Sequence, residues 1–186
     1  ILFFTNQIFL KYLIKNDKNI NLFVYQKNLY YLTLHLKLSS LFYSTQLIEI
    51  FAYEIPTNNN EKIKNKNISN LNNSIIVYNF HNIIFQQRFF LFILNKKNYN
   101  LNKNFITWTN VNSITELFLN ANWLEREIHE LHGIFFSGKK DLRNLMLQYG
   151  DFSNPMIKIF PSIGNKELCY DSVNDLLIQC QTTIQY

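Results

Sequence analysis

The spacing of apolar and polar residues divides the first half of the chain into short elements. Residues 3–14 are expected to form a short helix, and residues 19–26 a strand. Over residues 29–38 every second residue is apolar, as in a strand, but the intervening residues are apolar too except Thr33, His35 and Lys37, so a strand and a helix both fit. Residues 47–55 are rich in Ile, Phe and Tyr and stop before Pro56, which predicts another strand.

A polar stretch in the middle of the chain precedes two strongly apolar ones. Residues 56–73 are mostly Asn, Lys and Ser with few bulky side chains, which predicts an exposed loop. Residues 74–84 and 88–94 are rich in β-branched and aromatic residues. Joined across residues 85–87, they are predicted to form an antiparallel hairpin.

Farther along, apolar residues recur at steps of three and four, the pattern of an amphipathic helix. Ser113 and Glu116 have the spacing of a capping box, and Gly133 suits a left-handed helix end. The pattern predicts a helix from about Ser113 to His132, with a break near Asn120 because Asn is a poor helix former. The apolar stripe consists of Ile114, Leu117, Ala121, Leu124, Ile128 and Leu131.

Composition limits what the charge can indicate. Arg contributes only three of the 18 basic residues, and Gly and Pro are scarce, as expected of a chain encoded by an A/T-rich genome such as an organelle's. The formal net charge of +5 then follows from Lys enrichment and does not by itself indicate an anionic partner. A surviving Arg, Gly or Pro is correspondingly more informative.

Length and apolar content fit one folded domain followed by a tail. We expect the domain over residues 1–147 and the tail over residues 148–186, where periodic runs are few. The apolar runs at 1–14 and 83–94 contain polar residues and fall short of the ~18–20 apolar residues that cross a bilayer. The opening lacks the Arg of a transit sequence, and a chain made inside an organelle would need none.

The trio Glu125-Arg126-Glu127 first suggests acid–base chemistry on the predicted helix. Side chains two apart on a helix point about 200° from each other, so the two carboxylates cannot converge on one substrate. Glu125 borders the apolar stripe, where a charge requires a partner. We therefore interpret the trio as an ion-pair hub that fixes the following loop, with Arg143 or Lys158 as the partner of Glu125.

The thiols and imidazoles give weaker signals. Cys169 and Cys180 lack the spacing of a zinc or redox pair and are interpreted as reduced thiols. His129 and His132 stand three apart on the predicted helix, but no acidic or sulfur ligand completes an obvious set, so no metal site is predicted.

A block of rare residue types follows the spacing of a known signature. The matching residues are Ala121, Asn122, Trp123, Glu125, Arg126, Glu127, Gly133, Ile134, Phe136, Asp141, Leu142, Arg143, Pro155, Lys158 and Pro161. The block resembles the 30 kDa subunit family of respiratory complex I, which includes mitochondrial NADH dehydrogenase subunit 9 and its bacterial counterpart. Weaker likeness continues upstream at residues 54–56 and 76–79.

The resemblance implies an α+β fold, with a small mixed or antiparallel sheet packed on helices and an extended C-terminal tail that contacts neighbouring subunits. It implies a core structural subunit, without a catalytic site of its own, of the proton-translocating NADH:ubiquinone oxidoreductase. The expected place is the matrix side of the mitochondrial inner membrane, beside the quinone-module 49 kDa subunit and cluster-bearing subunits. The residues expected at subunit interfaces are Trp123, Glu125, Arg126, Glu127, Gly133, Phe136, Asp141, Arg143, Pro155, Lys158 and Pro161.

The resemblance also implies that this chain binds no cofactor. FMN and the iron–sulfur clusters are expected in partner subunits. Two cysteines are fewer than the roughly four ligands of a cluster. The chain departs from the family pattern after Gly133, where Lys139 and Lys140 replace a His-Pro pair and Asn144 replaces an Arg. The alternative class is a basic mitochondrial ribosomal protein that binds RNA, although such a protein would gather its charges in runs.

Overall fold

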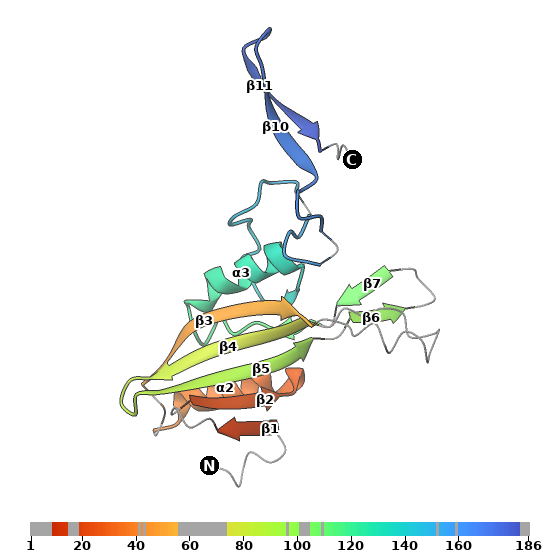
Figure 1. Ribbon diagram of the computed structural model, residues 1–186. Helices are drawn as coiled ribbons and strands as arrows, with labels where there is room; N and C mark the ends of the chain where they lie inside the picture. Colours follow the sequence, from red (N-terminus) through yellow and green to blue (C-terminus); the bar gives the residue numbers. More distant parts are fainter. Residues whose placement is uncertain are drawn as a thin grey trace.

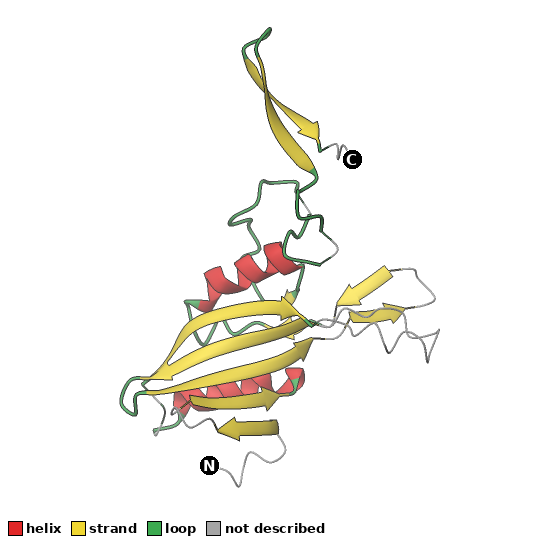
Figure 2. Ribbon diagram, in the orientation of Figure 1, coloured by secondary structure: helices red, strands yellow, loops and turns green. Residues whose placement is uncertain are grey.

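A mixed five-stranded sheet with two helices forms the body of the protein in the computed structural model (Figure 1). The structure describes residues 9–14, 19–40, 42, 44–55, 74–95, 97–100, 105–108, 110–151, 153–158 and 160–182. The predicted loop at 56–73 lies outside these residues. The expected α+β class is confirmed, with the helices and strands distributed as Figure 2 shows.

The sheet has the strand order β1-β2-β5-β4-β3, and every neighbouring pair is antiparallel except β2 and β5, which run parallel. The predicted hairpin is confirmed as β4 and β5, with its turn at residues 83–86. The predicted strands at 19–26 and 47–55 correspond to β2 and β3. The bounds are Phe9–Ile14 for β1, Asn19–Val24 for β2, Thr45–Glu54 for β3, Ser74–Asn82 for β4 and Gln87–Asn95 for β5.

The helix predicted over residues 3–14 is wrong where the structure describes it, because residues 9–14 form β1. This strand pairs antiparallel with β2, which otherwise would be the edge of the sheet. Pairing satisfies backbone groups along both strands, a gain that comes from the following strand β2 rather than from residues 9–14 alone and that outweighs weak local helix propensity. Residues 3–8 lie outside the described part of the chain.

The ambiguous segment after β2 is a helix, α2 (Leu29–Leu38), which follows a short 3₁₀ turn, η1 (Gln26–Asn28). Its buried residues Leu29, Leu32, Thr33 and Leu36 recur at steps of three and four, so the helical period decided the outcome. The Thr33 hydroxyl donates to the Leu29 carbonyl at 3.0 Å and is satisfied within the helix.

The core lies on one face of the sheet, where both helices pack. Alternate residues of the central strands point into it, as the period of two along a strand requires. On the opposite face Phe51, Tyr53 and Leu94 are exposed. The core strand residues are Leu47, Ile50, Ile76, Tyr78, Phe80, Phe89, Leu91 and Ile93, and the second helix contributes Ala121 and Ile128.

This second helix, α3 (Ala121–His132), is flanked by two short strands, β8 (Val111–Asn112) and β9 (Phe136–Ser137), which pair in parallel. The separate strands β6 (Lys97–Asn100) and β7 (Phe105–Trp108) form a hairpin of their own. Neither α2 nor α3 is long and apolar enough to span a membrane, and no other described helix is.

The C-terminal segment contains a hairpin that the sequence analysis did not predict. Strands β10 (Lys166–Asp171) and β11 (Leu176–Gln181) pair antiparallel as a separate two-stranded sheet. They project away from the five-stranded sheet (Figure 1). The proposed division at residues 147 and 148 remains a prediction, although part of the segment beyond it is folded.

Two leucines on opposite faces of β5 test this arrangement. Leu91 is 0% exposed in the core, whereas Leu94 is 40% exposed on the other face. We expect Leu91→Ala to lower the free energy of unfolding by about 2–5 kcal/mol and Leu94→Ala by less than about 1 kcal/mol. Urea denaturation of the purified chain measures both. Equal losses would contradict the assignment of the core to one face.

Candidate functional site

The site is built around α3, whose ends are fixed by contacts with distant parts of the chain. At its start the Asn120 side chain does not cap the helix but donates to the Leu47 carbonyl of β3 at 3.1 Å. At its end Gly133 adopts a left-handed φ of 69°, and its N–H donates to the His129 carbonyl at 2.9 Å. The predicted glycine cap is confirmed. The positive φ favours glycine here, and a Cβ would in addition lie 2.8 Å from the Asn154 side chain, which would have to move.

The helix starts later than predicted, and the capping box is wrong. Residues 113–120 form turns, and Glu116 is exposed at the surface. The Ser113 hydroxyl instead donates to the Glu125 carboxylate at 2.7 Å, and the Ile114 N–H donates to it at 2.9 Å. The buried carboxylate therefore takes the hydroxyl that a capping box would have used, and the Ser113 N–H donates to the Ser137 carbonyl at 2.9 Å instead of to Glu116.

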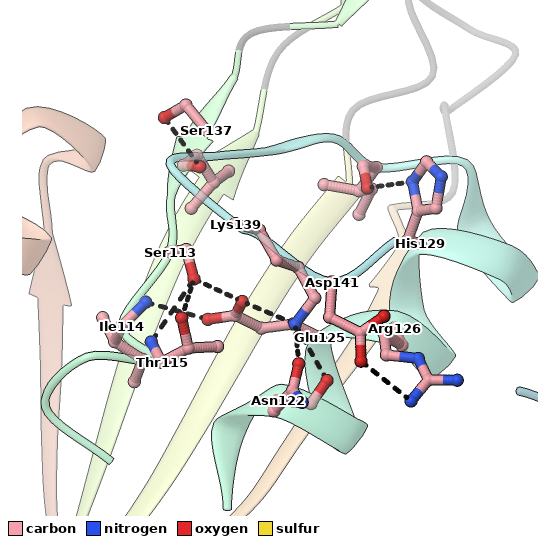
Figure 3. Close-up of polar contacts among 12 residues, drawn as sticks. Ser113, Ile114, Thr115, Asn122, Glu125, Arg126, His129, Ser137, Lys139 and Asp141 are labelled. Atoms are coloured by element: carbon pink, nitrogen blue, oxygen red, sulfur yellow. Dashed lines mark hydrogen bonds and ion pairs between the residues drawn. The ribbon is translucent and has the colours of Figure 1, made fainter. Parts of the chain in front are cut away.

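Glu125 is the centre of this arrangement, with 0% of its side chain exposed. Besides the donors at Ser113 and Ile114, it accepts from the Lys139 ammonium at 3.3 Å (Figure 3). Three parts of the chain thus converge on one carboxylate: the turn before α3, the helix itself and the loop after it. Burial raises the pKa of Glu125, while the three donors act in the opposite direction.

Lys139, rather than Arg143 or Lys158, is the partner of Glu125. Its ammonium also donates to the Asn122 carbonyl at 2.8 Å and to the Asn122 side-chain oxygen at 3.0 Å. All three N–H donors of the ammonium therefore have acceptors. Burial lowers the pKa of Lys139, and the neighbouring Glu125 raises it. The sequence hypothesis of a hub that fixes the following loop holds at Glu125, but its assigned partner was wrong.

Arg126 attaches the same loop at a second point. Its guanidinium donates to the carbonyls of Arg143 at 2.8 Å and Asn144 at 3.1 Å, and lies 3.7 Å from the Asp141 carboxylate. Arg143 itself pairs with Asp141 through two bonds of 3.0 Å. Hydrogen bonds from Arg143 hold the pKa of Asp141 well below its usual range. The loop conformation is thus set by two groups of contacts: Arg126 binds the loop backbone, and Asp141 binds Arg143 within the loop.

Glu130 fixes the end of this loop. Its buried carboxylate accepts from the N–H groups of Leu145, Met146 at 2.8 Å and Leu147 at 2.9 Å. Burial raises the pKa of Glu130, but these donors and the Arg126 charge outweigh it, and the net shift is below the ordinary value of 4.5. Successive backbone amides converging on one carboxylate stabilise its charged form.

The two histidines lie in the last turn of α3. The His129 ring bonds to the Ile134 carbonyl at 3.0 Å and packs edge-on against Phe135, with ring centroids 4.8 Å apart. Burial lowers the pKa of His132, and the Glu54 charge acts against this shift. Among the described residues, no group of three or more His, Cys, Asp or Glu side chains is placed to hold a metal ion.

The remaining signature residues are distributed between the core and the surface. Gly133 and Phe136 are buried, Glu127 and Pro155 are half-buried, and Trp123 is 63% exposed. Lys158 and Pro161 are exposed. The structure thus brings together Glu125, Arg126, Asp141 and Arg143, but leaves Lys158 and Pro161 apart from them.

The segment that contains Pro155 and Lys158 returns to the domain through its backbone. The Met156 N–H donates to the Leu131 carbonyl at 3.0 Å, and the Lys158 N–H donates to the Glu54 carboxylate at 2.9 Å. The beginning of the expected tail therefore contacts the end of α3 and the end of β3.

Sequence reasoning missed Lys139, Glu130 and Asn122 as members of this network. A signal for Lys139 was present, because a carboxylate beside the apolar stripe requires a cation and Lys139 is the first basic residue after the helix. Glu130 gave no comparable signal, since its partners are backbone amides that any sequence would provide.

Comparisons with known proteins bear on the same region. A family model described as the respiratory-chain NADH dehydrogenase 30 kDa subunit matches residues 23–166. NADH-ubiquinone oxidoreductase subunit 9 of Paramecium primaurelia is 40% identical over 95 residues, which cover 48% of this chain and 42% of that protein. The NADH-ubiquinone oxidoreductase 30.4 kDa subunit of Neurospora crassa is 49% identical over 61 residues, covering 33% of this chain and 22% of that one.

These alignments span less than half the length of either relative. Among solved structures, a chain of the membrane-bound sulfane sulfur reductase, an archaeal respiratory membrane complex, has a similar fold with a TM-score of 0.60. It is 13% identical, and the match covers 82% of this chain and 78% of that one. At this identity the likeness concerns the fold alone.

Adjacent lysines of opposite exposure test the pair at Glu125. The Lys139 side chain is 1% exposed and that of Lys140 is 91% exposed. Lys139→Met leaves a buried carboxylate without its cation and is expected to lower the free energy of unfolding by about 3–5 kcal/mol. Lys140→Met should change it by less than about 0.5 kcal/mol. Adding Glu125→Gln to Lys139→Met should restore part of the loss, and a strictly additive result in denaturation experiments would count against the pair.

Glu130 should confer a pH dependence on stability. Its pKa is lower in the folded chain, so its contribution is complete above the ordinary value of 4.5 and is lost as pH falls through the folded value. At pH 7 we expect Glu130→Gln to cost about 1–3 kcal/mol, and the difference from the wild type to shrink in acid. Denaturation curves at several pH values measure this. A difference that grows in acid would show that the sign is wrong. Glu127→Gln, on the same helix, is the control.

Proposed function

The chain belongs to the 30 kDa subunit family of respiratory-chain NADH dehydrogenase, and we propose that it serves as a non-catalytic structural subunit of the peripheral arm of NADH:ubiquinone oxidoreductase. The observation that carries this proposal is the family match over residues 23–166, which includes α3 and the whole loop fixed by Glu125, Arg126 and Glu130. In this role the chain supports assembly and the quinone-reducing module.

The proposed location is the matrix side of the mitochondrial inner membrane. Relatives from Paramecium primaurelia and Neurospora crassa are named as ubiquinone oxidoreductase subunits, and the latter as mitochondrial. The proposed neighbours are the 49 kDa subunit of the quinone module and the subunits that carry iron–sulfur clusters. FMN and these clusters are assigned to the partner subunits, and none to this chain.

The network around α3 supports a binding role because it holds the surface formed by α3 and the following loop in a fixed shape. Its buried pairs hold the helix and the loop at 138–144 in one geometry, so a partner that binds there does not have to order them. The groove between them is lined by Leu119, Trp123, Lys140 and Asp141, among others. Trp123 also lies under the Arg126 guanidinium, 5.9 Å from its ring centroid, which limits the motion of the exposed indole.

Exposed aromatic residues on a fixed surface are frequent anchors of protein interfaces. We therefore assign Trp123 to a contact with a partner subunit and the buried residues Glu125 and Arg126 to its support. The charged side chains of Lys140 and Asp141, which also line the groove, would set the orientation of the partner and contribute less to the affinity.

A pair of exposed aromatic residues tests both the function and the surface. The native chain should migrate with a large membrane complex that has NADH dehydrogenase activity. Trp123→Ala should reduce incorporation by about tenfold or more without a comparable loss of stability, as expected of an interface anchor. Tyr31→Ala, which removes a 69% exposed ring from α2, should leave incorporation unchanged.

Native electrophoresis with in-gel activity staining, followed by detection of the chain, measures these outcomes. Migration of the wild-type chain with ribosomes or as a free monomer would overturn the proposed function. Normal incorporation of the Trp123 variant would overturn only the assigned surface.

A further inference from the structure

The C-terminal hairpin places the two cysteines of the chain on one face. Cys169 pairs with Ile178 across the hairpin, and Cys180 pairs with Glu167. Side chains two apart on a strand share a face, so these four side chains point the same way. Cys169 and Cys180 are therefore diagonal neighbours, although ten residues separate them in the sequence.

The hairpin register that produces this neighbourhood is fixed at both ends. At the turn, the Asp171 carboxylate accepts from the Val173 N–H at 3.0 Å and from the Asn174 side chain at 2.7 Å. At the base, the Thr182 hydroxyl donates to the Gly164 carbonyl at 2.8 Å. Since a slip of one residue would send a thiol to the opposite face, these contacts keep both thiols on the same face.

The placement of the two thiols on one face is accompanied by an effect of Cys180 on Cys169. The neighbouring Cys180 raises the pKa of the Cys169 thiol, first through hydrogen bonding and then through charge interaction. Cys169 is exposed and Cys180 half-buried, so both can be reached from solvent. These are the requirements for exchange with a small disulfide: two adjacent sulfurs and access for the reagent.

The structure of the hairpin also allows the two sulfurs to approach to the distance of a disulfide bond. A disulfide brings the sulfurs to about 2 Å, closer than a hydrogen-bond contact. Diagonal neighbours on a strand pair start about 7–8 Å apart, so the bond requires rotation of both side chains and a small change in the right-handed twist, which is large in two-stranded ribbons. The sheet of β10 and β11 has no third strand among the described residues, so rotation of the side chains and a small change of twist meet no packed neighbour in the sheet.

We propose that Cys169 and Cys180 are a reversible modification site that forms an intramolecular disulfide with a low-molecular-weight disulfide as the oxidant. One protein thiolate attacks a sulfur of the oxidant, forms a mixed disulfide and releases one small thiolate. The second protein thiolate attacks the mixed disulfide, forms the Cys169–Cys180 bond and releases the other. The two thiol protons pass to the departing thiolates, and the two electrons lost by the protein sulfurs reduce the oxidant. This site is independent of the proposed assembly role.

The test is equilibration of the purified full chain with oxidised and reduced glutathione at about pH 8.5, near the ordinary thiol pKa. Because the chain has only these two cysteines, free thiols and mass report on the site directly. We expect both thiols to disappear, the mass to fall by about 2 Da and no glutathione to remain attached. Dithiothreitol should restore both thiols.

Three variants make the test specific. Cys169→Ser and Cys180→Ser should each stop at a mixed disulfide that retains one glutathione. The double variant Cys180→Ser, Gln179→Cys moves the second thiol to the opposite face at nearly the same sequence separation. Its equilibrium constant for ring closure should be at least about tenfold lower than that of the wild type. The hairpin register then no longer holds the second thiol near Cys169, so the effective concentration of one thiol at the other is lower.

A wild-type chain that retains glutathione on both cysteines, or that forms disulfide-linked dimers instead, would overturn the proposal. Equal ring closure in the wild type and the shifted double variant would also overturn it, since the hairpin register would then have no part in the reaction.

Discussion

A single buried carboxylate determines how the second half of the domain is arranged. Glu125 cannot remain charged inside the protein without donors, and a lone helix supplies none to a side chain in its second turn. The donors come from Ser113 and Ile114 before the helix and from Lys139 after it. Satisfying one carboxylate therefore fixes the entry to α3, its start and the loop beyond its end. Arg126 and Glu130 extend the same control to residues 143–147.

Such a network contributes more to specificity than to net stability. Desolvation of Glu125 and Lys139 offsets much of the attraction between them, as the opposite shifts of their pKa values indicate. Two apolar side chains in place of Glu125 and Lys139 could fill the same space. They would not form the directional bonds that hold the turn before α3 and the loop after it against the helix. Under the proposed function, the buried charges supply a defined geometry of the loop beside Trp123, which a surface that contacts other subunits requires.

Local patterns predicted the features that the residue spacing itself specifies, and failed where a contact with another segment decided the outcome. The β4–β5 hairpin and the cap at Gly133 follow from periodicity and from glycine's freedom at positive φ. The strand β1 depends on pairing with β2, and the failure of the capping box depends on Glu125, twelve residues after Ser113. The position of Lys139 as the first basic residue after the helix made it a candidate, but choosing it over Arg143 required the path of the loop.

The exposed apolar surface shows the same dependence on partners at a larger scale. One face of the sheet is covered by α2 and α3, whereas Phe51 and Tyr53 on the other face stay 38% and 42% exposed. The C-terminal hairpin exposes Leu168 and Leu177 still more, at 70% and 73%. Two isolated strands are marginally stable in water, so this hairpin gains most from burial against another surface. The chain thus completes one core by itself, and under the proposed function its neighbours would cover the apolar surfaces that remain.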